Sequence, residues 1–298
     1  RGCPVDGGVT VETCPGSLWP MGTDRLRQWM DVADACYAPE HAAAWDSVGL
    51  QVGDPDDPVT QVLVSLDVTG AVLDEAERSG ADLILAHHPL LFRPLPRLTP
   101  GTAAGGLALR AARAGCAVLA VHTNFDAAAS GTTTPIVDLL ALRDVAPLEP
   151  LADDPALGLG RIGDLPVPLS LRDVADRLAS GLPAPHLRVA GPLDRAVRRV
   201  AACAGAGDSL VEAAHRAGAD LYVTGDLRHH VALDALQLGM TLIDAGHYAT
   251  EAPALPALCA RLATAAAARG LTAGLLASAT ITEPWSDYCA HHEVKART

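Results

Sequence analysis

The sequence lacks the closely spaced cysteine pairs that are typical of thiolate zinc sites and of small disulfide-bonded folds. Its seven cysteines are scattered along 298 residues without a Cys-x-x-Cys pair. An odd, dispersed set argues against a disulfide framework and against a thiolate zinc site. We therefore expect a reducing compartment, and the cytoplasm is the simplest one.

Aromatic residues, long apolar runs and positive charge are also scarce. Aromatic residues make up only 3% of a chain that is 49% hydrophobic, so its core must be built from alanine, valine and leucine. No apolar stretch reaches the roughly 18 residues of a membrane span, and the first twenty residues contain no apolar signal-peptide region. The formal net charge of -13 argues against a general nucleic-acid or anionic-membrane surface.

The distribution of proline and glycine predicts the organisation of the chain. We interpret residues 1–22 as a disordered leader, 23–130 as a first α/β half and 131–298 as a second α/β half. Prolines and glycines become frequent between residues 147 and 195. We expect this stretch to be a linking segment of the second half rather than a separate catalytic domain.

Hydrophobic periodicity predicts alternating helices and strands in the first half. Apolar residues at helical spacing predict a helix capped by Asp24 and ended by Pro39. In the segment that follows, Trp45 is the natural core anchor, and Asp46 is more easily explained as a helix cap than as a functional acid. Further predicted elements are strands at 61–68 and 117–121 and helices at 70–79 and 107–114.

A run of four apolar residues, 83–86, leads directly into His87 and His88 and then a proline. Such a run is typical of a buried strand in a parallel sheet, and the carboxyl ends of such strands are where open α/β sheets bind ligands. Adjacent strand side chains point to opposite faces, but at a strand end both imidazoles can serve neighbouring metal ions. An isolated pair would more often be one core and one surface histidine.

Two further predicted strands end in a histidine that is followed four residues later by a carboxylate. These pairs are His122 with Asp126 and His247 with Glu251. On a helix this spacing would be an ordinary surface contact, but glycine, threonine or asparagine nearby makes us expect strand-to-loop turns instead. Imidazole with carboxylate suits Zn, Fe, Mn or Ni, whereas calcium would require oxygen ligands alone. Two carboxylates among several histidines suit a pair of bridged ions and therefore favour hydrolysis.

The second half repeats the pattern of the first. Residues 200–224 align with 62–86 without a gap, and 239–247 align with 115–122 with a shift of one residue. The two histidine–carboxylate pairs thus occupy corresponding positions. We interpret the chain as two related strand–helix–strand halves, although convergent α/β patterning can produce a similar likeness.

Five ordered motifs resemble the signatures of the Nif-three-like family, whose members are often labelled GTP cyclohydrolase I type 2 homologues. They are Trp-Asp-Ser-Val-Gly-Leu (45–50), His-His-Pro-Leu-Leu-Phe (87–92), His-Thr-Asn-Phe-Asp (122–126), Thr-Gly-Asp-Leu-Arg-His-His (224–230) and Asp-Ala-Gly-His-Tyr-Ala-Thr-Glu (244–251). The resemblance covers roughly residues 24–285. It implies two α/β domains of similar topology with a dinuclear metal site in the cleft between them, and a homohexamer built as a trimer of dimers.

The resemblance also implies a ligand set for two divalent metal ions per chain, with Glu251 as the bridge. These ligands are His87, His88, Asp126, His247 and Glu251. His122 belongs to the same motifs but is a less secure ligand, so we assign it a catalytic role as a proton carrier or a place behind the ligands.

Some residues depart from the family pattern or remain open. Ser47 stands where the family usually shows asparagine, and Gly-Ala-Gly at 205–207 replaces Gly-Ser-Gly. Neither change touches the inferred ligands, so substrate fit is more in doubt than metal binding. His229 and His230 are tempting as further ligands, but such a pair at a helix start more often faces solvent.

These observations predict a dinuclear metal-dependent hydrolase that acts on a nucleotide-like or phosphorylated small molecule through metal-activated water. The sequence has no Gly-x-x-x-x-Gly-Lys phosphate loop, which leaves the substrate open. The alternative is a non-catalytic metal-binding or regulatory adaptor protein. An open coordination position would distinguish them, because catalytic sites keep one and structural sites do not.

Overall fold

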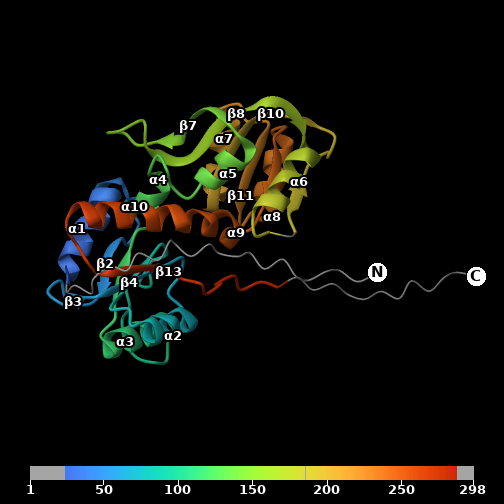
Figure 1. The fold of residues 1–298 in the computed structure, drawn as a ribbon. Helices are drawn as coiled ribbons and strands as arrows, with labels where there is room; N and C mark the ends of the chain where they lie inside the picture. The colour runs from blue at the N-terminus through green and yellow to red at the C-terminus, as the bar shows by residue number, and fades with distance from the viewer. Residues whose placement is uncertain (1–23, 185, 287–298) are drawn as a thin grey trace, which may run out of the picture.

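The computed structural model describes residues 24–184 and 186–286, which form a mixed α/β fold with two large sheets (Figure 1). The leader predicted at residues 1–22 lies outside the described residues. A short antiparallel pair, β1 (Asp24–Arg25) with β3 (Pro58–Val59), precedes the first large sheet. Within the described ranges, every helix is too short or too polar to cross a membrane.

The first large sheet has five strands in the order β13-β4-β5-β6-β2. The four adjacent strands β13, β4, β5 and β6 are parallel, and β2 pairs antiparallel with β6. The strands are β2 (Gly49–Val52), β4 (Gln61–Ser65), β5 (Leu83–Ala86), β6 (Ala117–Ala120) and β13 (Gly274–Ala277). The helices around it are α1 (Leu26–Cys36), α2 (Gly70–Ser79), α3 (Ala103–Ala114) and α10 (Leu255–Ala268), with a 3-10 turn at Pro39–His41.

The second large sheet has six strands in the order β7-β8-β10-β11-β12-β9. The adjacent strands β10, β11 and β12 are parallel, and β7, β8 and β9 run antiparallel to their neighbours. The strands are β7 (Arg143–Pro150), β8 (Gly158–Ser170), β9 (Arg188–Ala190), β10 (Ala196–Ala206), β11 (Leu221–Gly225) and β12 (Thr241–Asp244). The helices are α4 (Thr123–Ala127), α5 (Thr134–Leu140), α6 (Leu171–Gly181), α7 (Val211–Arg216), α8 (His229–Gln237) and α9 (His247–Glu251), with 3-10 turns at Asp208–Leu210 and Ala252–Ala254.

Alternate residues of each buried strand face two different helical layers. In β5, Leu83 and Leu85 pack with α1 and α10, whereas Ile84 packs with α2 and α3. In β11, Leu221 and Val223 pack with α5 and α6 in the same way, and the intervening residue packs with α7 and α8. This period of two explains why the strands read as continuous apolar runs, since both faces of each sheet are covered.

The repeated topology predicted from the sequence is present in the structure. Val62 pairs with Leu83 across β4 and β5, and Val200 pairs with Leu221 across β10 and β11, so the ungapped alignment reproduces the strand register. The next strands, β6 and β12, extend the two sheets in the same direction. Both sheets therefore present the carboxyl ends of three consecutive parallel strands.

The predicted boundaries between the halves are wrong in two respects. The second half does not run to residue 298, because α10 and β13 return to the first sheet, where β13 pairs with β4 and α10 packs against α1. The stretch 147–195 is not a linker, because it forms the second half of β7 and all of β8, α6 and β9. Pro147 and Pro150 lie in the edge strand β7, where proline is tolerated.

Two local predictions are also corrected. Trp45 is 63% exposed and is no core anchor, whereas Trp29 of α1 is fully buried and takes that role. The first helix begins at Leu26 with Arg25 as its N-cap, and Asp24 is not the cap. Asp24 lies in a short strand and accepts hydrogen bonds from the backbone amides of Thr272 and Ala273. The predicted helix at 70–79 is confirmed.

A buried arginine joins the short helix α4 to the second sheet. Arg161 of β8 is 5% exposed, and its guanidinium donates to the carbonyls of Ala127 and Ala128 at the end of α4 and to those of Gly158 and Gly160. A cation at a helix C-terminus interacts favourably with the helix dipole. Arg161 therefore donates to several buried carbonyls at once and ties the end of α4 to β8.

We expect Arg161→Met to lower the free energy of unfolding by roughly 3 kcal/mol, because several buried carbonyls lose their donor. Arg110→Met is the control, since Arg110 pairs with Asp74 and Glu77 at the surface and should matter little. Urea unfolding followed by circular dichroism measures both. Equal midpoints for the two variants would contradict the role of Arg161.

Candidate metal centre

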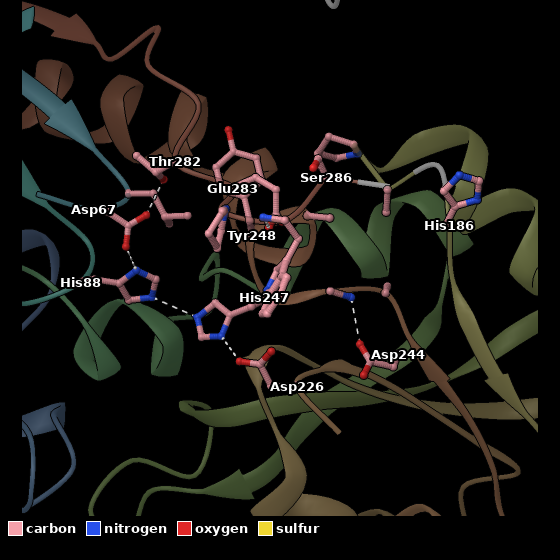
Figure 2. Close-up of a pocket in the computed structure, with 18 of the residues that line it drawn as sticks. Asp67, His88, His186, Asp226, Asp244, His247, Tyr248, Thr282, Glu283 and Ser286 are labelled. Carbon is pink, nitrogen blue, oxygen red and sulfur yellow. Dashed lines mark hydrogen bonds and ion pairs between the residues drawn. The ribbon is translucent and has the colours of Figure 1, made fainter. Parts of the chain in front are cut away.

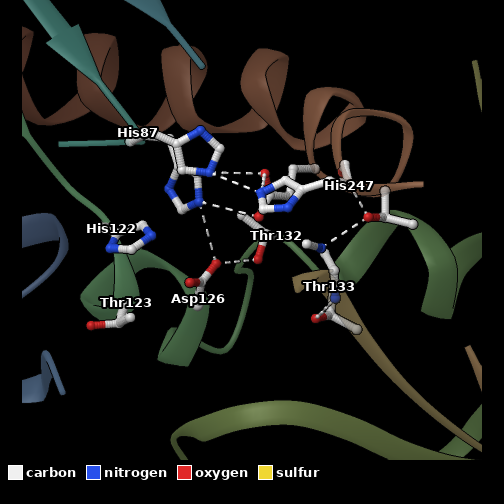
Figure 3. A network of polar contacts seen from close by, with 12 residues as sticks. His87, His122, Thr123, Asp126, Thr132, Thr133 and His247 are labelled. Atoms are coloured by element: carbon white, nitrogen blue, oxygen red, sulfur yellow. Dashed lines mark hydrogen bonds and ion pairs between the residues drawn. The ribbon is translucent and has the colours of Figure 1, made fainter. Parts of the chain in front are cut away.

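The carboxyl ends of strands from both sheets meet at one cluster of histidines and carboxylates. His87 and His88 follow β5, His122 follows β6, and His247 follows β12 after a single glycine and alanine. Figure 3 shows His87, Asp126 and His247 converging, with Thr132 donating a hydrogen bond to Asp126. The structure thus brings together residues that are up to 164 positions apart, as the distance between His87 Nε2 and Glu251 Oε1 of 3.7 Å shows.

Both histidine–carboxylate pairs start short helices, which corrects our expectation of strand-to-loop turns. His122 is the residue before α4, which contains Asp126, and α9 runs from His247 to Glu251. The spacing of four residues therefore does act through a helical turn. The imidazole and the carboxylate of each pair project from one face of that turn toward the cluster rather than toward solvent.

Each of the four histidines is fixed through its Nδ1 atom. The acceptors are a backbone carbonyl or carboxylates, which cannot donate, so each Nδ1 must carry the hydrogen and each Nε2 can offer a lone pair. The four contacts are His87 with the carbonyl of Val121 (2.9 Å), His88 with Asp67 (2.8 Å), His122 with Asp46 (2.7 Å) and His247 with Asp226 (2.7 Å).

The Nε2 atoms of three of these histidines converge on the carboxylate of Glu251. Its Oε2 atom lies 3.1 Å from Nε2 of His88 and 3.2 Å from Nε2 of His247, and its Oε1 atom lies 3.7 Å from Nε2 of His87. His87 Nε2 is also 3.6 Å from Asp126 Oδ1. Ligands about 2.1 Å from one ion at angles near 90–109° lie about 3.0–3.4 Å apart, so these spacings approach those of a coordination shell.

Two atoms of the cluster are buried without a hydrogen-bond partner, namely His87 Nε2 and Glu251 Oε2. Nε2 of His88 and Nε2 of His247 also face one another at 3.2 Å. Two imidazole nitrogens that both carry hydrogens would repel at this distance. The arrangement is therefore chemically suited to a cation, which would satisfy both of the buried atoms that lack a partner.

The imidazoles and the carboxylates of the cluster stabilise one another's charged forms. Burial disfavours the charged form of His88, but its hydrogen bond with Asp67 and its ion pair with Glu251 raise its pKa to about 10. Burial acts in the same sense on His247, whose pKa is raised to about 9 by Glu251 and Asp226. Burial opposes ionisation of Glu251, yet the close imidazoles that face it hold its pKa well below the usual range. Binding of metal ions must therefore displace protons from imidazoles.

Two overlapping groups have the spacing to hold a metal ion, and they share His88. The first is His87, His88 and His122, and the second is His88, His247 and Glu251. Four of the five predicted ligands therefore fall in these groups, and Asp126 adjoins the first through His87. His122 belongs to a candidate group as well, so its geometry is closer to that of a ligand than the sequence indicated.

The doubtful histidines of the sequence lie elsewhere. His229 and His230 begin α8, and both are exposed, as expected for a solvent-facing pair. Neither belongs to a group with metal-binding spacing among the residues that the structure describes.

The acids that orient the histidines were largely missed from the sequence. Asp46 was assigned a capping role, and it does accept from the amide of Thr123, but it also holds His122. Burial opposes its ionisation, whereas hydrogen bonds from His122 and Thr123 keep its pKa well below normal. Asp67 and Asp226 could have been found from the sequence, because each lies one or two residues after the end of a buried strand. Asp226 also adopts a left-handed φ of 55°, which marks a constrained position.

A cavity of about 960 Å³ opens beside the cluster, and His88 and His247 lie in its wall (Figure 2). Its lining comes from both sheets and includes Asp226, Asp244 and Tyr248. A volume near the top of the range for small-molecule sites leaves room for a substrate next to the histidines.

The profile of the Duf34/NIF3 (NGG1p interacting factor 3) family matches residues 25–284. This match covers most of the chain and all of the cluster. The chain belongs to the DUF34/NIF3 family.

Relatives agree with this assignment. A GTP cyclohydrolase 1 type 2 homolog of Streptomyces coelicolor is 37% identical over 271 residues, covering 89% of this chain and 95% of the relative. A protein of the same name from Lactococcus lactis subsp. lactis is 38% identical over 216 residues, covering 72% and 82%. A solved Bacillus cereus protein related to NIF3 has a TM-score of 0.84 at 25% identity, over 90% of this chain and 100% of that one.

A glycine of this DUF34/NIF3 chain makes room for the central carboxylate. A Cβ atom at Gly205 would lie 2.0 Å from Oε1 of Glu251 and 3.4 Å from Nε2 of His247. The φ of 68° at Gly205 also favours glycine. A side chain there would therefore displace Glu251 from its position among the imidazoles.

We expect Gly205→Ala to reduce bound metal several-fold after metal loading, because the methyl group occupies the position of a Glu251 oxygen. Gly218→Ala is a matched control, since its φ of 77° imposes similar backbone strain but nothing lies within 4 Å of the added carbon. Elemental analysis gives the metal content, and circular dichroism checks the fold. Equal metal content in the two variants would show that Gly205 is not needed for this space.

Proposed function

We propose that this DUF34/NIF3 family member is a dinuclear metal-dependent hydrolase. The observation that carries the proposal is the position of Glu251, whose two oxygens face different histidines. A carboxylate with one oxygen toward each of two groups is suited to bridge two cations. Zn, Fe, Mn and Ni all accept this mixture of imidazole and carboxylate.

The distances divide the predicted ligands into two sets. His87 and Asp126 lie on the side of Oε1 of Glu251, whereas His88 and His247 lie on the side of Oε2. Each set with Glu251 offers three protein atoms to an ion. Three ligands leave positions open for substrate or water, which is the arrangement of catalytic rather than structural sites.

Metal ions bound there would lower the pKa of water and offset negative charge on a leaving oxygen. His122 is suited to move the proton, because Asp46 accepts from its Nδ1 and so leaves Nε2 free to take a proton. The side chain of Asp46 is shielded from solvent, and the amide and hydroxyl of Thr123 hold it in place. This pair therefore fixes both the orientation and the tautomer of His122.

The substrate class follows from the cavity and from the names of the relatives. The relatives are named GTP cyclohydrolase 1 type 2 homologs, which makes nucleotides the first class to test. The cavity of about 960 Å³ has room for such a molecule beside His88 and His247. A nucleotide-like or phosphorylated small molecule would place an oxyanion toward the cations.

We expect two metal ions per chain in protein purified without chelators. Glu251→Gln keeps the shape of the side chain but removes the charge between the two ligand sets, so it should lose one ion and weaken the other. His230→Gln should keep both ions, since His230 is exposed at the start of α8. Elemental analysis of the three proteins measures this. Zero or one ion in the metal-loaded wild-type protein would rule out the dinuclear site.

Turnover provides the second test of this proposal. The metal-loaded protein is incubated with a panel of nucleotides and phosphoesters, and released phosphate or formate is measured. We expect one compound to be hydrolysed, with a rate that falls by orders of magnitude in Glu251→Gln and by about 10²–10⁴-fold in His122→Asn. Full metal content without turnover of any compound would favour the non-catalytic alternative.

We further propose a homohexamer built as a trimer of dimers. Large apolar side chains are exposed on this chain, including Trp45, Phe92 and Leu98 around one hollow and Leu233, Leu236 and Leu238 near α8. Such side chains are typical of surfaces covered by another protein molecule. Light scattering at micromolar concentration should give six times the mass of one chain. A monomer under these conditions would refute the assembly.

A further inference from the structure

The chain ends its described part in an extended segment, residues 278–286, which we call the C-terminal strap. The strap leaves β13 and is fixed at its root by the first sheet. Ser278 donates its amide to the carbonyl of Val64. Glu75 of α2 then accepts hydrogen bonds from the side chains of Ser278 and Thr280 and from the amide of Ala279. This root holds the strap at the edge of the first sheet.

Beyond its root, the strap contacts the candidate metal centre through one side chain. The hydroxyl of Thr282 donates to Oδ2 of Asp67, and Oδ1 of the same carboxylate accepts from Nδ1 of His88 at 2.8 Å. Figure 2 shows Thr282, Asp67, His88 and His247 in one continuous series. The series ends where Nε2 of His88 faces Nε2 of His247 at 3.2 Å.

The strap is also a wall of the cavity beside the histidines. The last five described residues, from Thr282 onward, all line that cavity. Trp285 is 83% exposed, so the end of the strap gains little from packing its largest side chain. The hydrogen bond of Thr282 is therefore a specific contact that holds this part of the strap beside the site.

We propose that Thr282 is a positioning residue for the metal ligand His88 and acts through Asp67. The inference rests on the proposed metal centre. A carboxylate anchored at only one oxygen can rotate, whereas Thr282 fixes the second oxygen and thereby the plane of Asp67. The orientation of the His88 ring depends on that plane, and groups that orient ligands in this way alter metal affinity. Because coupling between two sites is reciprocal, metal binding also holds the strap in place.

The test uses Co(II) as the probe and the full chain as the protein. Thr282→Val keeps the shape of the side chain but removes the hydrogen-bond donor to Asp67. The dissociation constant of the Co(II) ion bound by His88 should therefore rise about tenfold. The visible absorption bands of the bound Co(II) should shift, because the ligand field from His88 changes with the orientation of its ring. Thr280→Val is the matched control, since it removes a hydroxyl from the same strap that bonds Glu75 rather than Asp67. Its affinity and spectrum should equal those of the wild type.

A double-mutant cycle separates positioning from a general loss of structure. Asp67→Asn should weaken Co(II) binding at least as much as Thr282→Val, and adding Thr282→Val to Asp67→Asn should cost nothing further. Unchanged binding in Thr282→Val, equal losses in Thr280→Val, or additive losses in the double variant would each overturn the inference. Failure of the wild-type protein to bind Co(II) would instead refute the metal centre, and this inference with it.

Discussion

The burial of the Glu251 carboxylate is the constraint on which the rest of the structure depends. Its side chain is 5% exposed at the meeting point of the two sheets, and a buried charge is costly unless donors or cations surround it. Three imidazole nitrogens lie within 3.7 Å, and two of them belong to the first sheet. The charge balance of the site therefore depends on how the two sheets are placed relative to one another. Any separation of the sheets would take two of these three imidazoles away from Glu251.

The repeated topology explains how two similar sheets produce an asymmetric site. The alignment that places Val62 on Val200 also places Asp67 on Gly205. In the first sheet this strand end holds a carboxylate that orients His88. In the second sheet the same position carries no side chain, and the free space is filled by Glu251. The same position of the repeat thus orients the candidate ligand His88 in the first half and leaves space for the candidate ligand Glu251 in the second half.

The sequence predicted the features that depend on neighbouring residues. The strand ends, the histidine pair and the matching His-x-x-x-acid spacing are local patterns, and the family resemblance added the ligand set. The return of α10 and β13 to the first sheet was not predictable, because pairing of Ala277 with Val64 depends on contacts across more than 200 residues. The helical start of α9 was also misjudged, since Gly246 before it suggested a turn. Its φ of 85° in fact directs the chain from β12 into the helix.

The scarcity of aromatic residues makes their positions informative. Of the three tryptophans that the structure describes, only Trp29 is buried, so aliphatic side chains fill most of the core. Trp45 borders a hollow of about 480 Å³ and lies 6.3 Å from the ring of His122, while Trp285 borders the larger cavity at His88 and His247. Exposed indoles cost solubility without adding to the core, and such exceptions to burial are expected near functional sites. The prediction that Trp45 is a core residue failed for this reason, because a residue type that usually stabilises the interior is here placed beside the histidines.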